Sequence, residues 1–171
     1  DMRFRVVSGR SGADLVTSAD PPKMMLEGRV TTWPELITVE KCETIQLADL
    51  DGDGKAEVVL ALDSGRVLGL DPVSARAKFT GKYQSTSISW LPILRDLDGD
   101  GAADVTAISG GKLVARSGKT SADLWSVPGG QDPSVYALVD GLLAGRPLAV
   151  VVSMYGSVAG YDPRDGSQKW A

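Results

Sequence analysis

At 171 residues, of which 43% are hydrophobic, the chain is long enough to bury one substantial core and is not expected to be disordered. It has no run of about 18 apolar residues, so we expect no insertion into a membrane. Its net charge of −4 argues against a nucleic-acid partner. The chain contains no His, and its single cysteine, Cys42, cannot form an internal disulfide.

The first 42 residues give the weakest signals. Residues 3–8, followed by Val16, match only the second half of a repeat that recurs further along the chain. We therefore predict half a repeat unit over 1–16 and an irregular insertion over 17–42. The β-branched residues between Gly28 and Lys41 leave open an alternative, in which this segment adds strands out of order.

The first complete unit is predicted over 43–80, with four short strands at about 43–48, 56–62, 66–70 and 76–80. Residues 56–62 are a short apolar run rich in β-branched residues, lying between turns that contain Gly, which is typical of a strand. A second unit is predicted over 91–126 and a third over 135–171.

An acidic loop follows the first strand of the first unit, and it recurs in the second unit. The sequence Asp-Leu-Asp-Gly-Asp-Gly occurs at 49–54 and again at 96–101. Each copy carries carboxylates at positions 1, 3, 5 and 9, and four carboxylates so close repel one another unless a cation lies between them. Hard oxygen ligands on a flexible backbone suit Ca²⁺ better than zinc or copper. Two calcium sites are predicted, formed by Asp49, Asp51, Asp53 and Glu57, and by Asp96, Asp98, Asp100 and Asp104.

The net charge fits this hypothesis. Eight of the 22 acidic residues lie in the two loops, and two bound Ca²⁺ ions would bring the formal charge from −4 to about zero. An EF-hand is excluded, because that loop needs a Glu at position 12 and helices on both sides. Position 12 is Leu60 in the first copy and Ala107 in the second, and the flanks 56–62 and 103–108 predict strands.

The third unit lacks the acidic loop. By alignment its loop spans 140–146, in which Asp140 is the only carboxylate, so we expect no metal there. A hairpin that ends in an aromatic residue recurs in all three units. These hairpins begin at 65–71, 111–117 and 156–162 and run on to Phe79, Trp125 and Trp170. Because their spacing follows the repeat, we interpret these aromatic residues as anchors between neighbouring units rather than as a ligand platform.

A period of about 45 residues with four strands per unit is typical of a β-propeller blade. A four-stranded sheet cannot bury both faces alone, whereas stacked sheets cover one another's faces. We therefore predict an all-β fold over 1–171, a β-propeller or partial propeller of four-stranded antiparallel blades, with about three full blades and an N-terminal half-blade. Such a segment does not close a ring, so the rest of a larger propeller or another chain is expected to complete it.

The acidic loops resemble a known repeat. The DxDxDGxxD pattern at 49–57 and 96–104 is similar to the FG-GAP/VCBS-type calcium-binding repeat of integrin α-subunit propellers and related bacterial propellers. The resemblance covers about 43–126, and 135–171 in outline. It implies Ca²⁺ bound by the acidic positions, with the main-chain carbonyls of Lys55 and Ala102 as further ligands. The hairpin at 158–170 is also similar to the tryptophan-docking repeat of quinoprotein-type propellers.

No catalytic residue is predicted. The chain has no His, no Gly-rich phosphate loop and no nucleophile elbow, and Glu43 discourages thiolate formation at its neighbour Cys42. The alternative is a part of a quinoprotein-like or other propeller enzyme whose active site lies outside this segment.

We expect calcium to stabilise a binding or scaffold module that recognises a protein or a carbohydrate, as in cell adhesion. The need for abundant calcium favours an extracellular, cell-surface or periplasmic location. The connections at 81–90 and 126–135 are rich in Gly, Ser, Thr and Pro, and they are the predicted recognition loops. Tyr83 and Trp90 are the candidate contact residues in the first of them, although Trp90 packing into the next blade is an equally good interpretation.

Overall fold

The computed structural model describes residues 5–7, 10–11, 13–17, 23–26, 29–32, 41–84, 91–128, 135–143, 145–153 and 156–171. Every regular element within these ranges is a strand, and none of the described segments forms a helix that is long and apolar enough to cross a membrane. The strands form three four-stranded sheets and two short hairpins, all with antiparallel pairing.

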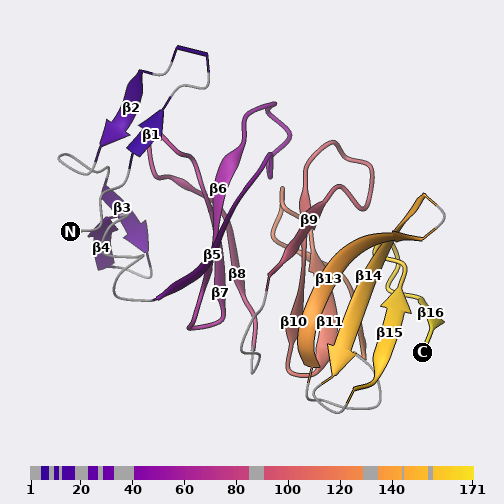
Figure 1. Cartoon of the computed structure of the whole chain (residues 1–171). Coiled ribbons are helices and arrows are strands. Elements are labelled where there is room, and N and C mark those ends of the chain that lie inside the picture. Colours follow the sequence, from indigo (N-terminus) through magenta and orange to yellow (C-terminus); the bar gives the residue numbers. More distant parts are fainter. Residues whose placement is uncertain are drawn as a thin grey trace.

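Each four-stranded sheet takes its strands in sequence order. The first contains β5 (Cys42–Ala48), β6 (Glu57–Leu62), β7 (Arg66–Leu70) and β8 (Ala77–Lys82). The second contains β9 (Ile93–Arg95), β10 (Asp104–Ser109), β11 (Lys112–Arg116) and β12 (Asp123–Pro128). The third contains β13 (Val135–Leu143), β14 (Arg146–Ser153), β15 (Val158–Tyr161) and β16 (Gln168–Trp170). The predicted all-β fold of four-stranded antiparallel blades is therefore confirmed (Figure 1).

The N-terminal segment contains two hairpins. β1 (Arg5–Val7) pairs with β2 (Asp14–Thr17), in the region predicted as half a blade. β3 (Lys23–Leu26) pairs with β4 (Arg29–Thr32) inside the segment 17–42, which we expected to be irregular. The β-branched Val30, Thr31 and Thr32 belong to β4, so this part of the segment is a strand, as its β-branched residues favour.

Alternation along the strands sends side chains to both faces of each sheet, so that neighbouring sheets share their cores. The second sheet lies between the first and the third (Figure 1). A cluster of buried apolar side chains fills each of the two interfaces. The first interface is formed by Leu50, Val59, Ala61, Val67, Phe79 and Tyr83 against Val105, Ala107 and Val114. The second is formed by Ile93, Ile108 and Leu113 against Ala149, Val151, Ala159 and Tyr161. The second sheet is thus apolar on both faces, which only a stacked arrangement buries.

The three recurrent aromatic residues lie opposite a small residue of the neighbouring strand. The cross-strand pairs are Gly69–Phe79, Ala115–Trp125 and Gly160–Trp170. A Cβ at Gly160 would lie 2.5 Å from the Trp170 indole, so the aromatic ring occupies the space above the glycine.

Two of these aromatic residues anchor neighbouring sheets, as predicted. Phe79 is buried between the first and second sheets, and Trp125 packs against the third, where its Nε1 donates to Pro163 O at 3.1 Å. Trp170 lies on the face of the third sheet that points away from the second, and 38% of it remains exposed.

The turn between the third and fourth strands of each sheet has the same backbone path. Its first residue, which is Asp71, Ser117 or Asp162, accepts a main-chain hydrogen bond from a residue four positions later. That residue has a positive φ in each case, +57° at Ala75, +60° at Ser121 and +70° at Gly166. The left-handed conformation crowds a Cβ against the backbone, so only the third sheet has the residue that this turn favours.

We expect Ser121→Gly to raise the free energy of unfolding by about 0.5 kcal/mol, because relief of the left-handed strain slightly exceeds the entropy that Gly adds to the unfolded chain. Gly166→Ala should lower it by about 2 kcal/mol or more, since it adds that strain and a close contact. The new Cβ would lie 2.8 Å from Trp125 Cε3 and 3.0 Å from Val127 Cγ1. Urea unfolding of both variants checks the pair, and equal shifts in the same direction would contradict the assignment.

Candidate metal centre

The two acidic loops occupy the same place in neighbouring sheets. The first connects β5 to β6 and the second connects β9 to β10. In the first loop, oxygens of Asp49, Asp51 and Asp53 lie within 4.8 Å of one another. In the second, the corresponding oxygens belong to Asp96, Asp98 and Asp104, again within 4.8 Å. The structure therefore brings together six of the eight predicted carboxylates, in two groups of three. Glu57 and Asp100 lie outside these groups.

Main-chain N–H groups hold the first carboxylate of each loop in place. Asp49 accepts from the N–H groups of Gly52 and Gly54, each at 2.7 Å, and Asp96 accepts from that of Gly99 at 2.7 Å. The glycines at positions 4 and 6 of both loops have φ between +76° and +85°, where a side chain is strained. The repeated Asp-Gly pairs thus fold the loop around its own first carboxylate.

The ninth residue of each loop fastens it to the sheet. Glu57 Oε2 accepts from the main-chain N–H of Leu50 at 2.8 Å, and Asp104 Oδ2 accepts from that of Leu97 at 2.8 Å. Both carboxylates are almost completely buried. Asp104 Oδ1 also accepts from the N–H of Gly118 at 3.2 Å.

The leucine at position 2 is an anchor that the sequence analysis missed. Leu50 and Leu97 are buried. A Cβ at Gly69 would lie only 2.1 Å from Leu50 Cδ1, so the leucine side chain fills the space that the glycine leaves. The signal was the same apolar residue at the same position of two otherwise polar loops.

Burial raises the pKa of the Glu57 carboxyl, and the nearby Asp49, Asp51 and Asp53 carboxylates raise it further against the hydrogen bond from Leu50. Burial likewise raises the pKa of Asp104, with hydrogen bonds from Leu97 and Gly118 opposing it. A negative charge at either position is therefore costly in the absence of a cation.

Lysine side chains supply part of the missing positive charge. Lys78 Nζ contacts Asp51 Oδ2, and this hydrogen bond is the main reason that the pKa of Asp51 is lowered. In the second loop Lys119 Nζ lies 3.9 Å from Asp100 Oδ2, a longer contact that involves the carboxylate at position 5 rather than at position 3. A metal ion in the first loop would compete with Lys78 for Asp51, whereas no ion pair of the described residues brings an ammonium group so close to a carboxylate of the second loop.

The two loops are in direct contact. The main-chain N–H of Ala103, at position 8 of the second loop, donates to the carbonyl oxygen of Asp49 at 2.7 Å. Gly118 lies against both loops, because a Cβ there would be 2.0 Å from Ala103 O and 2.8 Å from Leu50 O. The stacking of the sheets thus joins the two acidic clusters into one structural unit.

Asp140 differs from its predicted place. It lies within β13, opposite Ala149, and not at the start of a loop. The last pairs between the first and second strands before the acidic loops are Ala48–Glu57 and Arg95–Asp104, and the pair at the same register in the third sheet is Gly141–Leu148. The residue that follows the first member of each pair is Asp49, Asp96 and Leu142. Leu142, and not Asp140, therefore stands at the position of the first loop residue. The alignment was wrong by two residues, since the third sheet replaces the acidic loop with a short hairpin. Asp140 instead accepts two hydrogen bonds from Arg95 Nη2, each at 2.7 Å.

Of the two predicted recognition residues, the structure describes only Tyr83. Tyr83 is buried between the first two sheets, its Oη 3.5 Å from Val105 O and its ring 4.7 Å from the Arg116 guanidinium, so it is a core residue and not a contact residue. Trp90 lies outside the described ranges, as do 85–90 and 129–134 of the two predicted recognition loops. Cys42 is half-buried, its Sγ donates to Thr44 O at 3.1 Å, and burial raises its pKa, which fits a structural thiol.

The donor chemistry of both loops suits a hard cation, because every converging ligand atom is a carboxylate oxygen. The main-chain N–H groups of Lys55 and Ala102 donate to the carboxylates of Asp53 and Asp100, at 2.8 and 2.9 Å. These two residues therefore stay beside the acidic side chains, and coordination by their carbonyl oxygens remains a prediction.

The sequence matches no protein-family model, and no curated protein is similar enough to count as a match. Among solved structures the chain is similar to BamB from Moraxella catarrhalis, with a TM-score of 0.49 and 17% sequence identity. The similarity covers 72% of this chain and 34% of that one, so the chain spans about a third of the length of that structure.

In the absence of calcium, we expect Glu57→Gln to stabilise the protein at pH 7, because Gln still accepts the Leu50 hydrogen bond without a buried charge. Since the folded-state pKa of Glu57 is raised, its ionisation costs stability above that pKa, and the cost disappears as the pH falls to the unfolded value. The stability difference between variant and wild type should therefore shrink from pH 7 towards pH 4. Unfolding in EGTA across this range measures it, and a difference that grows on acidification would contradict the assignment.

Proposed function

We propose that this chain is a calcium-stabilised β-propeller segment that serves as a binding or scaffold module for a protein or a carbohydrate. One observation carries the calcium proposal. Two loops of identical spacing, at the same place in adjacent sheets, each bring three carboxylates within 4.8 Å of one another. Among the ion pairs of the described residues, each lysine beside a loop pairs with a single carboxylate of that loop.

Calcium would neutralise the carboxylates and fix the connection between the first two strands of each sheet. Because the ion binds the folded loop, it would stabilise the folded state by ~2–4 kcal/mol at saturation. The hydrogen bond from Ala103 N–H to the Asp49 carbonyl oxygen joins the two loops. It supports a stabilising effect of calcium on both sheets, since an ion that fixes one loop also restrains the other. Loops of this kind commonly need high micromolar to millimolar calcium, which favours a site of action outside the cytosol.

We expect thermal unfolding in millimolar Ca²⁺ to occur well above the temperature found in excess EGTA. Asp51→Ala and Asp98→Ala should each remove about 1–3 kcal/mol of the stability measured in calcium. Asp140→Ala is the matched control, because it removes a carboxylate of a neighbouring sheet that pairs with Arg95. Its partly exposed ion pair should cost only about 0.2–1 kcal/mol, equally in calcium and in EGTA.

An unchanged melting temperature in calcium would refute the calcium proposal, and equal calcium-dependent losses in all three variants would refute the assignment of the two sites. The molecular mass in each condition shows whether calcium also changes the association of the chain. A rise in melting temperature without a change in mass would support stabilisation within a single chain.

The binding role is tested separately on a glycan array in calcium. A carbohydrate-binding module should retain specific glycans as the isolated chain, and Asp98→Ala should weaken this retention if calcium shapes the binding surface. A module that assembles with protein should retain none and should instead change its mass when the partner is added.

A further inference from the structure

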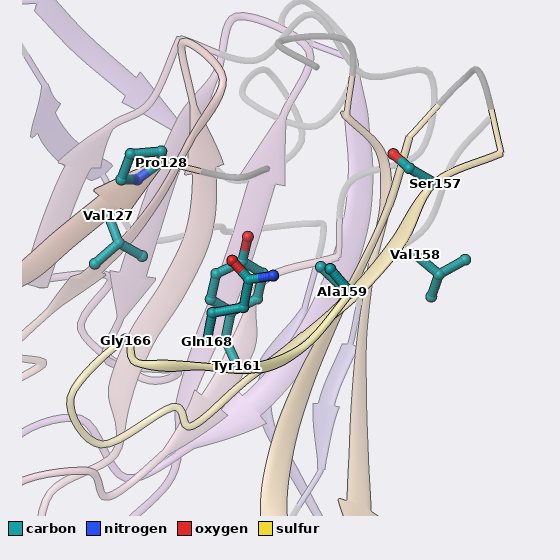
Figure 2. Close-up of a pocket in the computed structure, with 9 residues that line it drawn as sticks. Val127, Pro128, Ser157, Val158, Ala159, Tyr161, Gly166 and Gln168 are labelled. Atoms are coloured by element: carbon teal, nitrogen blue, oxygen red, sulfur yellow. The ribbon is translucent and has the colours of Figure 1, made fainter. Parts of the chain in front are cut away.

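A cavity of about 720 Å³ lies between the second and third sheets, on the side of their last strands. It is lined from β12 by Val127 and Pro128, from β15 by Val158, Ala159 and Tyr161, and from β16 by Gln168 (Figure 2). Its volume falls in the range of small-molecule sites, which is about 300–1,000 Å³. None of its lining residues belongs to the acidic loops.

The described residues that line this cavity are mainly apolar, and none of them has a charged side chain. Val127 and Ala159 belong to or pack against the core between the second and third sheets, so the cavity walls are parts of the stacked strands. Ser157 at its margin is already paired, because its hydroxyl donates to Ser153 Oγ at 2.7 Å. Such a surface favours an uncharged ligand that is mostly apolar.

Tyr161 supplies the polar group that lacks a partner. The residue is only 2% exposed, and its hydroxyl has no hydrogen-bond partner in the described part of the chain. In Figure 2 the phenol ring stands between Val127 and Pro128 on one side and Ala159 on the other. Burial raises the pKa of Tyr161, so the hydroxyl stays protonated at neutral pH and is a hydrogen-bond donor. A buried O–H group without an acceptor is unfavourable. The Tyr161 hydroxyl has almost no accessible surface as it stands, so a ligand acceptor reaches it from the cavity only by displacing a neighbouring side chain.

Comparison with the other two sheets shows that the fold does not require this unpaired hydroxyl. Tyr161 pairs with Ala149 of the second strand of its sheet. The pairs at the same register in the other two sheets are Leu70–Val58 and Arg116–Val105, so Leu70 and Arg116 stand at the position of Tyr161. Leu70 is buried in an apolar cluster, and Arg116 donates to Asp123 at 2.6 Å and to Lys82 O at 3.1 Å. Only the third sheet places a polar group here that the described residues leave without a partner.

We propose that this cavity binds a small, uncharged and mostly apolar molecule whose carbonyl oxygen accepts a hydrogen bond from Tyr161 Oη. The site does not depend on the calcium proposal, because its walls are strands of the second and third sheets and its donor is a side chain of β15.

The test uses acetophenone and ethylbenzene, which differ only in a carbonyl group and a methylene group. Titration of each into the ¹⁵N-labelled protein should shift the amide signals of Ala159, Gly166 and Gln168. Tyr161→Phe should weaken the binding of acetophenone relative to that of ethylbenzene by about three- to tenfold, the effect of one hydrogen bond. Using the ratio of the two affinities removes the difference in hydrophobicity between the probes.

Tyr83→Phe is the matched control, because it removes the hydroxyl of another buried tyrosine that does not line the cavity. It should leave the affinity ratio unchanged. Tyr161→Phe should fold at least as stably as the wild type, since it removes an unpaired hydroxyl. The proposal is overturned if neither probe shifts these amide signals, or if Tyr161→Phe leaves the affinity ratio at its wild-type value.

Discussion

The packing of one sheet on the next is the contact on which the rest of this structure depends. The second sheet has apolar side chains on both faces, such as Val105 and Ala107 towards the first sheet and Ile108 and Leu113 towards the third. Neither face is stable in water, so each sheet requires a neighbour. The small residues opposite the aromatic side chains serve this packing, because they leave room for a ring within the interface.

Stacking also determines where the chemistry of the chain lies. Because adjacent sheets repeat the same connection, their acidic loops meet, and the hydrogen bond from Ala103 to Asp49 joins them. The third sheet breaks the pattern, and there the guanidinium of Arg95 provides the positive charge beside Asp140. The cavity near Tyr161 lies along the next interface. Both proposed sites therefore depend on contacts between sheets.

Much of this arrangement could be predicted from the sequence, because short apolar runs between turns and units that recur leave a direct pattern. The predicted strand 66–70 coincides with β7. The place of Asp140 could not be predicted. The third unit lacks the acidic residues that align the first two loops, so its alignment had no fixed point, and the pairing of β13 with β14 determines the position of Asp140. Tyr83 and Tyr161 show the same limit. Their surroundings come from another sheet, so the residues beside them in the sequence do not reveal burial or a missing partner.

The exposed face of the third sheet has a consequence for the length of the stack. Solenoids and other stacked repeats usually end in a unit whose outer surface is polar, which stops growth and keeps the protein in solution. Trp170, Val139 and Val158 are 38%, 50% and 39% exposed, so the described part of this face is not a polar cap. Trp170 lies over Gly160 on this exposed face, whereas the aromatic residues at the same position of the first two sheets are covered by the next sheet. Among its described residues, this face therefore has apolar side chains of the kind that pack against another surface.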